Sequence, residues 1–319
     1  MELDEKDLNF LNIFLPEILP EYEFASQKGR FAYYTSADTA FKILEHAELW
    51  LRNATVMNDF MEISYGLELV DFAFDVGQVS GEKFRSVVKS IFPNALSRID
   101  ELYQGWKRDW VRETYISCIS AHDPSEDQYG RLSMWRAYGD IALIINNTPL
   151  MQVTDVLGVY SSPVIYVSHD TFRSRLLKIA RKIEENQNYL SGLGEDEFVA
   201  RVQHFLMMTA LCSKHPGFLE EREWRVFYRP TTHPSPLIKE KIVVKNGVAQ
   251  RIFTLPLIHS PENGLFGADI PSLLDRLIVG PTEYSYVVSR AFIALLERAG
   301  VTDAAKKVVI SDIPLRVHD

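Results

Sequence analysis

The sequence predicts a mixed α+β fold, with strands and helices interspersed along the chain. Short β-branched or aromatic runs such as "YISCIS" and "EWRVFY" have the length and composition of strands. Longer segments between them place apolar residues at helical spacing. No internal repeat, low-complexity tract or flexible linker divides the chain, so we expect a single α+β domain over residues 23–319, preceded by an N-terminal extension.

The first elements follow from apolar spacing and caps. Residues 1–22 predict a short helix interrupted by prolines. Residues 31–35 predict a strand, and Ser36 is well placed as the N-cap of the next helix. Ala40, Ile43 and Leu44 fall on one face of that helix. A second strand is expected at residues 49–51.

The middle of the chain is expected to carry most of the helices. Residues 64–109 and 170–214 predict two helical insertions, the second made of helices near 170–189 and 195–214. Between them, residues 114–120 predict a strand with Ile116, Cys118 and Ser120 on one side. A short helix ending near Gly139 and a buried strand, "IALIIN", follow, and "SPVIYVS" predicts another strand.

The last third predicts further strands. "EWRVFYR" has the pattern of a strand, and Asn246-Gly247 is a strong turn signal for a hairpin. The chain then predicts a strand at 276–279, a helix at 283–298 and a strand at 307–310.

Composition limits the function classes. The hydrophobic fraction of 46% and charged fraction of 24% are typical of a soluble globular protein. A net charge of −9 argues against broad, sequence-independent phosphate binding but leaves a local basic groove open. The two cysteines, Cys118 and Cys212, lie in apolar runs and predict buried free thiols in a reducing compartment. The acidic start and the lack of a long apolar run predict a cytoplasmic protein without a membrane partner.

Common catalytic motifs are missing from the sequence. It has no phosphate-binding glycine loop, no H-E-x-x-H and no G-x-S-x-G, and its eight histidines are dispersed. We therefore expect no metal site. Cys118 with a distant histidine could form a nucleophilic pair, but its apolar neighbours favour a buried inert thiol.

The stretch "PGFLEEREWRVFYRP" offers two acidic candidates. Alternation along a strand places Glu221, Glu223 and Arg225 on one face, while Trp224 and Val226 form the core side. The acidic face then meets either solvent or a cleft. Spacing alone favours a solvated face on which Arg225 pairs with a glutamate.

Four other stretches offer polar or aromatic candidates, each with a structural alternative. The paired tyrosines Tyr33 and Tyr34 point to opposite faces of their strand, so one can face a cleft, or both can pack with surface hydroxyls. Asn58-Asp59 favours a turn or the capping of the next helix. Ser117 and Ser120 could line a ligand surface. Trp135 and Tyr138, three residues apart, could form an aromatic wall or pack in the core.

The order of these motifs resembles one bacterial family, the domain of unknown function 2971. The resemblance runs from about residue 31 to residue 316, and "SMWRAYG" and "FLEEREWR" are its most specific blocks. Tyr33 stands where many members have histidine or arginine, and Phe60 replaces a proline. If the histidine has a ligand role, Tyr33 must supply it by another contact.

A second, weaker resemblance is to the ADP-ribosyltransferase superfamily. It implies a mixed sheet core with helical insertions, NAD as cofactor, and a late glutamate that stabilises the oxocarbenium-like transition state. On this sequence that glutamate is Glu223, with Glu221 placed to orient or deprotonate the acceptor. The candidate cofactor-binding residues are Tyr33, Thr35, Asn58, Asp59, Ser117, Ser120, Trp135 and Tyr138.

The function this resemblance implies is transfer of ADP-ribose to a protein or nucleic acid, in a toxin or phage-defence effector with a possible antitoxin partner. Three alternatives remain open. An NAD glycohydrolase would use the same residues with water as acceptor. A non-catalytic binding module would explain the missing histidine. A metal-dependent nuclease could use Asp59, Glu62, Glu221 and Glu223.

Overall fold

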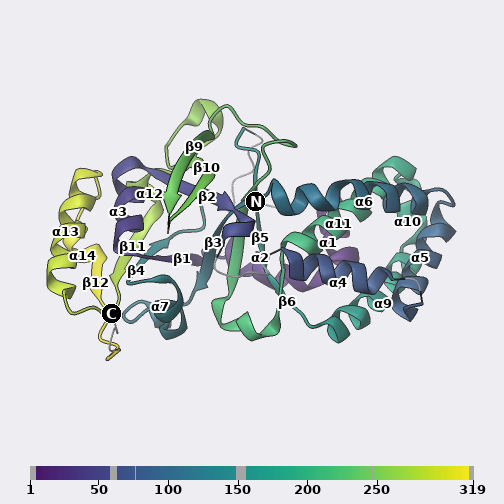
Figure 1. Ribbon diagram of the computed structural model, residues 1–319, viewed down its shortest axis with the longest axis horizontal. Helices are drawn as coiled ribbons and strands as arrows, with labels where there is room; N and C mark the ends of the chain where they lie inside the picture. The colour runs from purple at the N-terminus through teal and green to yellow at the C-terminus, as the bar shows by residue number, and fades with distance from the viewer. Residues whose placement is uncertain (1–4, 58–62, 76, 149–155, 246, 316–319) are drawn as a thin grey trace.

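The computed structural model describes residues 5–57, 63–75, 77–148, 156–245 and 247–315. It has a sheet region, on the left of Figure 1, and a helical region, on the right. This confirms the mixed architecture predicted from the sequence. Within the described residues, no helix is long and apolar enough to cross a bilayer.

Among the described residues, the main sheet has ten strands and is almost entirely antiparallel. Its order is β12-β11-β4-β1-β3-β2-β10-β9, with β8 paired to β3 and β5 paired to β8. Strand β12 pairs with β11 in parallel. The strands are β1 (Arg30–Thr35), β2 (Glu48–Asn53), β3 (Tyr115–His122), β4 (Ile141–Ile145), β5 (Val159–Pro163), β8 (Glu223–Tyr228), β9 (Lys239–Lys245), β10 (Val248–Pro256), β11 (Leu274–Val279) and β12 (Val308–Ile310). A second sheet joins β6 (Ile165–Tyr166) to β7 (Ser213–Lys214) in parallel.

The sheet branches at β3. On one side of β3, strand β8 pairs along Tyr115–Ser120. On the other side, β2 pairs only with Tyr115 and Ile116, and β1 pairs only from Ser120 onward. The residues from Ser117 to Ile119 therefore face a gap where β1 and β2 diverge.

The helical region surrounds the largest hydrophobic core. Its central helix, α11, packs against both α4 and α6, and α5 packs against α9. Trp110, Phe172 and Phe205 are fully buried there. The helices are α4 (Ser64–Phe74), α5 (Val79–Ile91), α6 (Ala95–Arg112), α9 (His169–Glu185), α10 (Gln187–Gly192) and α11 (Glu195–Leu211).

The N-terminal residues form more helix than the short, proline-interrupted helix that the sequence predicts. Helix α1 (Glu5–Phe14) is followed by the 3-10 helix η1 (Pro16–Ile18) and by α2 (Leu19–Ser26). Pro16 and Pro20 each lie in the first turn of their helix, where a missing N–H removes no hydrogen bond. Phe14 is 1% exposed within the core of the helical region, so α1 is packed into that core.

Helices also cover the sheet. On one face, α3 (Ala37–His46) and α13 (Ser285–Arg298) enclose a core with β4 and β11. The hydroxyl of Ser36 accepts a hydrogen bond from the Thr39 amide, which confirms the predicted N-cap of α3. The other helical segments are α7 (Leu132–Tyr138), α12 (Ile270–Leu273), α14 (Ala304–Lys307), η2 (Ala54–Val56), η3 (Pro124–Glu126), η4 (Pro216–Glu221) and η5 (Pro261–Asn263).

Candidate functional site

A cavity of about 270 Å³ opens at the gap between β1 and β2. Five residues singled out from the sequence line it together: Tyr33, Thr35, Ser117, Tyr138 and Glu223. They come from β1, β3, the end of α7 and the start of β8. The remaining lining residues are Tyr34, Ser36, Trp50, Arg52, Met57, Ile116, Cys118, Lys214 and Lys245.

Glu223 lies at the first position of β8, opposite Ser120 of β3. It is only 4% exposed. One carboxylate oxygen accepts a hydrogen bond from Arg225 Nε at 2.8 Å, and the other accepts one from Lys214 Nζ at 3.0 Å. Its backbone N–H donates to the hydroxyl of Tyr166 at 2.8 Å.

These contacts fix the charge of Glu223. Burial by itself raises the pKa of the carboxyl group, but the positive charges of Arg225 and Lys214 lower it well below its ordinary value. Glu223 is therefore an ionised carboxylate near neutral pH. All six residues of β8 are buried, so the interpretation favoured by spacing alone, a solvated acidic face, is wrong.

The strand alternation predicted for this stretch holds only from Glu223 onward. Trp224 and Val226 pack in one core, and Phe227 packs in the core of the helical region on the opposite face. Glu221, however, ends η4 rather than extending the strand. The cause is Arg222, whose left-handed backbone (φ 45°) breaks the alternation between the helix and β8.

Glu221 nonetheless reaches the same cluster by another route. Its carboxylate accepts hydrogen bonds from Tyr138 Oη and Lys214 Nζ, both at 2.7 Å. Arg131 holds η4 in place, because its guanidinium donates to the carbonyls of Glu220 and Glu221 at 2.9 and 3.1 Å. Lys214 thus bridges the two glutamates, and Tyr138 faces the cavity beside them.

Tyr33 and Ser117 lie near each other on the opposite wall of the gap. Burial raises the pKa of Tyr33, and the neighbouring Ser117 hydroxyl opposes part of that rise. Ser117 is 3% exposed, and its hydroxyl makes no hydrogen bond of good geometry among the residues that the structure describes. This buried hydroxyl lines the cavity next to Tyr33.

Four of the candidate cofactor-binding residues do not lie among the described lining residues. Trp135 is 5% exposed, contacts the Tyr34 ring at 4.8 Å and donates its indole N–H to the Tyr129 carbonyl, so it is a core residue. Ser120 is buried and lies opposite Glu223 in the register of β3 and β8. Asn58 and Asp59 fall outside the residues that the structure describes, as do Phe60 and Glu62.

Other lining residues were not predicted as site residues from the sequence. Lys214 was expected to end a helix, but it lies in β7, where it meets both glutamates. Arg52 and Trp50 share a face of β2 by simple alternation, a pattern visible in "ELWLRN". Cys118 was expected to be a buried thiol; it is half-buried and lines the cavity, whereas Cys212 is fully buried as predicted.

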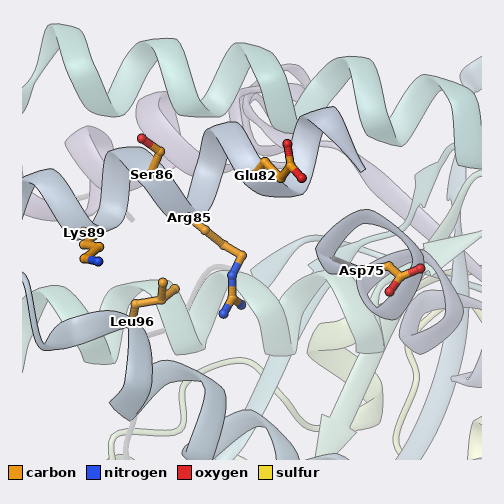
Figure 2. A pocket seen from close by; sticks show the side chains of 6 residues that line it. All are labelled: Asp75, Glu82, Arg85, Ser86, Lys89 and Leu96. Atoms are coloured by element: carbon orange, nitrogen blue, oxygen red, sulfur yellow. The ribbon is translucent and has the colours of Figure 1, made fainter. Parts of the chain in front are cut away.

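A second cavity lies in the helical region. It measures about 340 Å³ and is lined by Asp75, Glu82, Arg85, Ser86, Lys89 and Leu96. Figure 2 shows the Arg85 side chain extending away from α5. Its guanidinium makes two hydrogen bonds to the Asp100 carboxylate, at 2.8 and 2.6 Å. Because none of the candidate residues from the sequence lines this cavity, it is a weaker candidate than the cavity at β3.

The comparisons with known proteins bear on the middle of the chain. Neither the curated proteins nor the solved structures contain a match. The segment that matches a family model begins at Met134 in α7 and ends at Val226 in β8, so it includes all of "FLEEREWR" and all of "SMWRAYG" except Ser133. Residues 134–226 match the model of the family described as "Protein of unknown function (DUF2971)", to which this part of the chain is similar.

Proposed function

We propose that the chain binds NAD in the cavity at β3 and transfers its ADP-ribose to a macromolecular acceptor. The observation that carries this proposal is the convergence of Tyr33, Ser117, Tyr138 and Glu223 on one cavity from four separate parts of the chain. A buried carboxylate, hydroxyl donors and aromatic rings are the groups expected around a reacting ribose. NAD is proposed as the ligand because the sequence resembles ADP-ribosyltransferases.

The proposed reaction breaks the bond between nicotinamide and the ribose. Nicotinamide leaves with the bonding electron pair, and the ribose carbon becomes oxocarbenium-like. The ionised Glu223 would stabilise that cation, as carboxylates do in glycoside chemistry. The acceptor nucleophile then bonds to the same carbon and loses its proton, with Glu221 oriented by Tyr138 to assist.

The size of the cavity limits which part of NAD it can enclose. Its 270 Å³ lies just below the roughly 300–1,000 Å³ of sites that hold whole drug-sized ligands. The cavity would therefore enclose one end of the dinucleotide and leave the other end at its mouth.

The test combines NAD binding with product analysis. Calorimetry should detect NAD binding to the wild type, and labelled NAD should deliver label to a macromolecule in a lysate with release of nicotinamide. Glu223→Gln should lower the rate roughly 100-fold or more, because it removes the charge that stabilises the cation. Glu220→Gln, an exposed neighbour in η4, is the matched control and should keep full activity.

Glu223→Gln also removes the partner of two buried cations, so its folding must be checked by circular dichroism. Tyr138→Phe gives an independent variant that removes only the hydrogen bond to Glu221 and should slow transfer. Wild-type protein that neither binds NAD nor releases nicotinamide contradicts the proposal directly. Nicotinamide release without a labelled macromolecule would identify an NAD glycohydrolase.

A second candidate is a non-catalytic binding module, and the ion pairing of Glu223 favours it. The charges of Glu221 and Glu223 are matched by those of Lys214 and Arg225, which reduces the field available to a developing cation. Ligand binding that is unaffected by Glu223→Gln, without any nicotinamide release, would support this alternative.

A further inference from the structure

Two cations that line the cavity, Arg52 and Lys245, have no acidic partner among the residues that the structure describes, unlike Lys214 and Arg225. Arg52 donates to the side-chain oxygen of Gln250 at 2.9 Å and to the carbonyl of Val56 at 3.0 Å. Lys245 has only a long contact to the Thr39 hydroxyl, at 3.4 Å. Within the described part of the chain, neither forms an ion pair with Asp or Glu, and both line the cavity.

The sheet places these two side chains on the same face. Arg52 pairs with Ile252 of β10, and Lys245 pairs with Val248 of the same strand. Residues directly opposite in an antiparallel ladder share a face, and residues 248, 250 and 252 of β10 alternate onto one face. Gln250 lies between them and anchors the Arg52 guanidinium. The two cations are therefore held by adjoining strands.

Their electrostatic environment is unfavourable without an anion. Burial lowers the pKa of Arg52, and burial together with the Arg52 charge lowers the pKa of Lys245. The charge of Asp38 opposes this decrease at Lys245, but Asp38 is already paired with Lys42 at 2.8 Å. An anion between Arg52 and Lys245 would relieve their mutual repulsion.

The surroundings suit a phosphate group on an organic ligand. Trp50 lies two residues before Arg52 on the same strand face and also lines the cavity, so it offers a ring surface beside the cations. Thr35, the last residue of β1, and Ser36, the N-cap of α3, also line the cavity and carry hydroxyl groups. Arginine and lysine with neighbouring hydroxyls are common phosphate-binding partners.

We propose that Arg52 and Lys245 form a subsite for the phosphate of a free nucleotide, with Trp50 beside its ring system. The inference rests on the proposed function for the rest of the ligand, because the sugar would extend from this subsite toward Ser117 and Glu223. The proposal also assigns an orientation to the bound nucleotide. Its phosphates lie at the β2–β9 side of the cavity, and its reacting carbon lies at the β8 side.

The test measures the binding of ADP and of inorganic pyrophosphate by calorimetry at several salt concentrations. Both should bind, and the affinity should fall as salt rises. Lys245→Met should weaken ADP binding roughly 10- to 100-fold, as expected for the loss of one charged hydrogen bond. Lys239→Met, an exposed lysine on the same strand, is the control and should change the affinity less than about twofold.

Arg52→Lys provides a second variant that keeps the charge but removes the planar guanidinium. It should weaken ADP binding while leaving the chain folded. Equal ADP affinity in the wild type, Lys245→Met and Arg52→Lys would overturn the subsite, as would an absence of ADP and pyrophosphate binding. Stronger competition by a short oligonucleotide than by ADP would overturn the assignment to a free nucleotide.

These outcomes separate the two proposals. ADP binding that depends on Lys245, without any NAD cleavage, would support the phosphate subsite and contradict the proposed transferase activity. NAD cleavage with the same KM in the wild type and in Lys245→Met would contradict the phosphate subsite and support the proposed transferase activity.

Discussion

At the scale of single residues, the two cysteines show how environment separates chemically identical groups. Cys118 is half-buried, lines the cavity and contributes to the low pKa of Glu223. Cys212 is 1% exposed, and burial is the main cause that raises its pKa to about 12. Their sequence contexts are both apolar, so this difference depends on the branching of the sheet and could not be predicted from either stretch alone.

Cys118 is accordingly the thiol that should react in the native protein. We expect N-ethylmaleimide to modify Cys118 much faster than Cys212, since thiol reactivity follows exposure and thiolate population. Mass spectrometry of the native and unfolded chain measures both sites, and a nucleotide that fills the cavity should protect Cys118. Equal labelling of both cysteines would contradict this expectation, and Cys118→Ser serves as the control.

At the scale of elements, sequence reasoning succeeded where a local signal decides the structure. The Ser36 cap, the helix that ends at Gly139 and the strand after it all match the observed α3, α7 and β4. It failed near Glu221 and Lys214, where tertiary contacts decide. Arg131 holds the backbone of η4, and β6 pairs with β7, so neither stretch follows its own periodicity.

Gly139 shows how one element constrains another across the cavity wall. It has φ 132°, and a Cβ there would lie 2.6 Å from the Thr35 carbonyl and the Ser36 amide. Gly139→Ala should lower the free energy of unfolding by roughly 2 kcal/mol or more, since strain and overlap combine. Urea denaturation measures the loss.

Gly105, within α6, is the matched control for that change. A Cβ at Gly105 meets nothing within 4 Å, so Gly105→Ala should be neutral or slightly stabilising. Because Thr35 and Ser36 line the cavity, Gly139→Ala should also weaken nucleotide binding. Equal stability of the two variants would show that the α7–β1 junction tolerates a side chain.

At the scale of the whole molecule, ion pairs connect strands that are distant in sequence. Arg30 of β1 pairs with Asp127 and Asp275, both at 2.8 Å, and Arg276 of β11 pairs with Asp127 at 3.2 Å. His122, 1% exposed, joins this network through Asp127 at 2.9 Å. Such long-range pairings have no local signature, which explains why sequence analysis predicted the strands but not their order in the sheet.

The network gives the fold a pH dependence. Burial lowers the pKa of His122 below its ordinary value, and the nearby carboxylates oppose this only in part. The unfolded chain therefore binds a proton more readily, so the contribution of His122 to stability is lost as pH falls below about 6.5. His122→Asn should reduce the change in unfolding free energy between pH 7.5 and pH 5.5.

Urea denaturation at both pH values provides the measurement. His46→Asn, at a side chain that is 55% exposed, is the control and should leave the pH dependence of the wild type unchanged. If His122→Asn and the wild type lose the same stability on acidification, another group is responsible.

The divergence of β1 and β2 has a consequence for recognition. Between the two pairings, β3 presents a short length of main chain that no strand of the described residues pairs with on that side. A guest molecule that hydrogen-bonds to the main chain along this length of β3 would occupy the place of the missing strand segment. Hydrogen bonds from the main chain of β3 would then contribute to ligand recognition, and substitutions of side chains would not remove them.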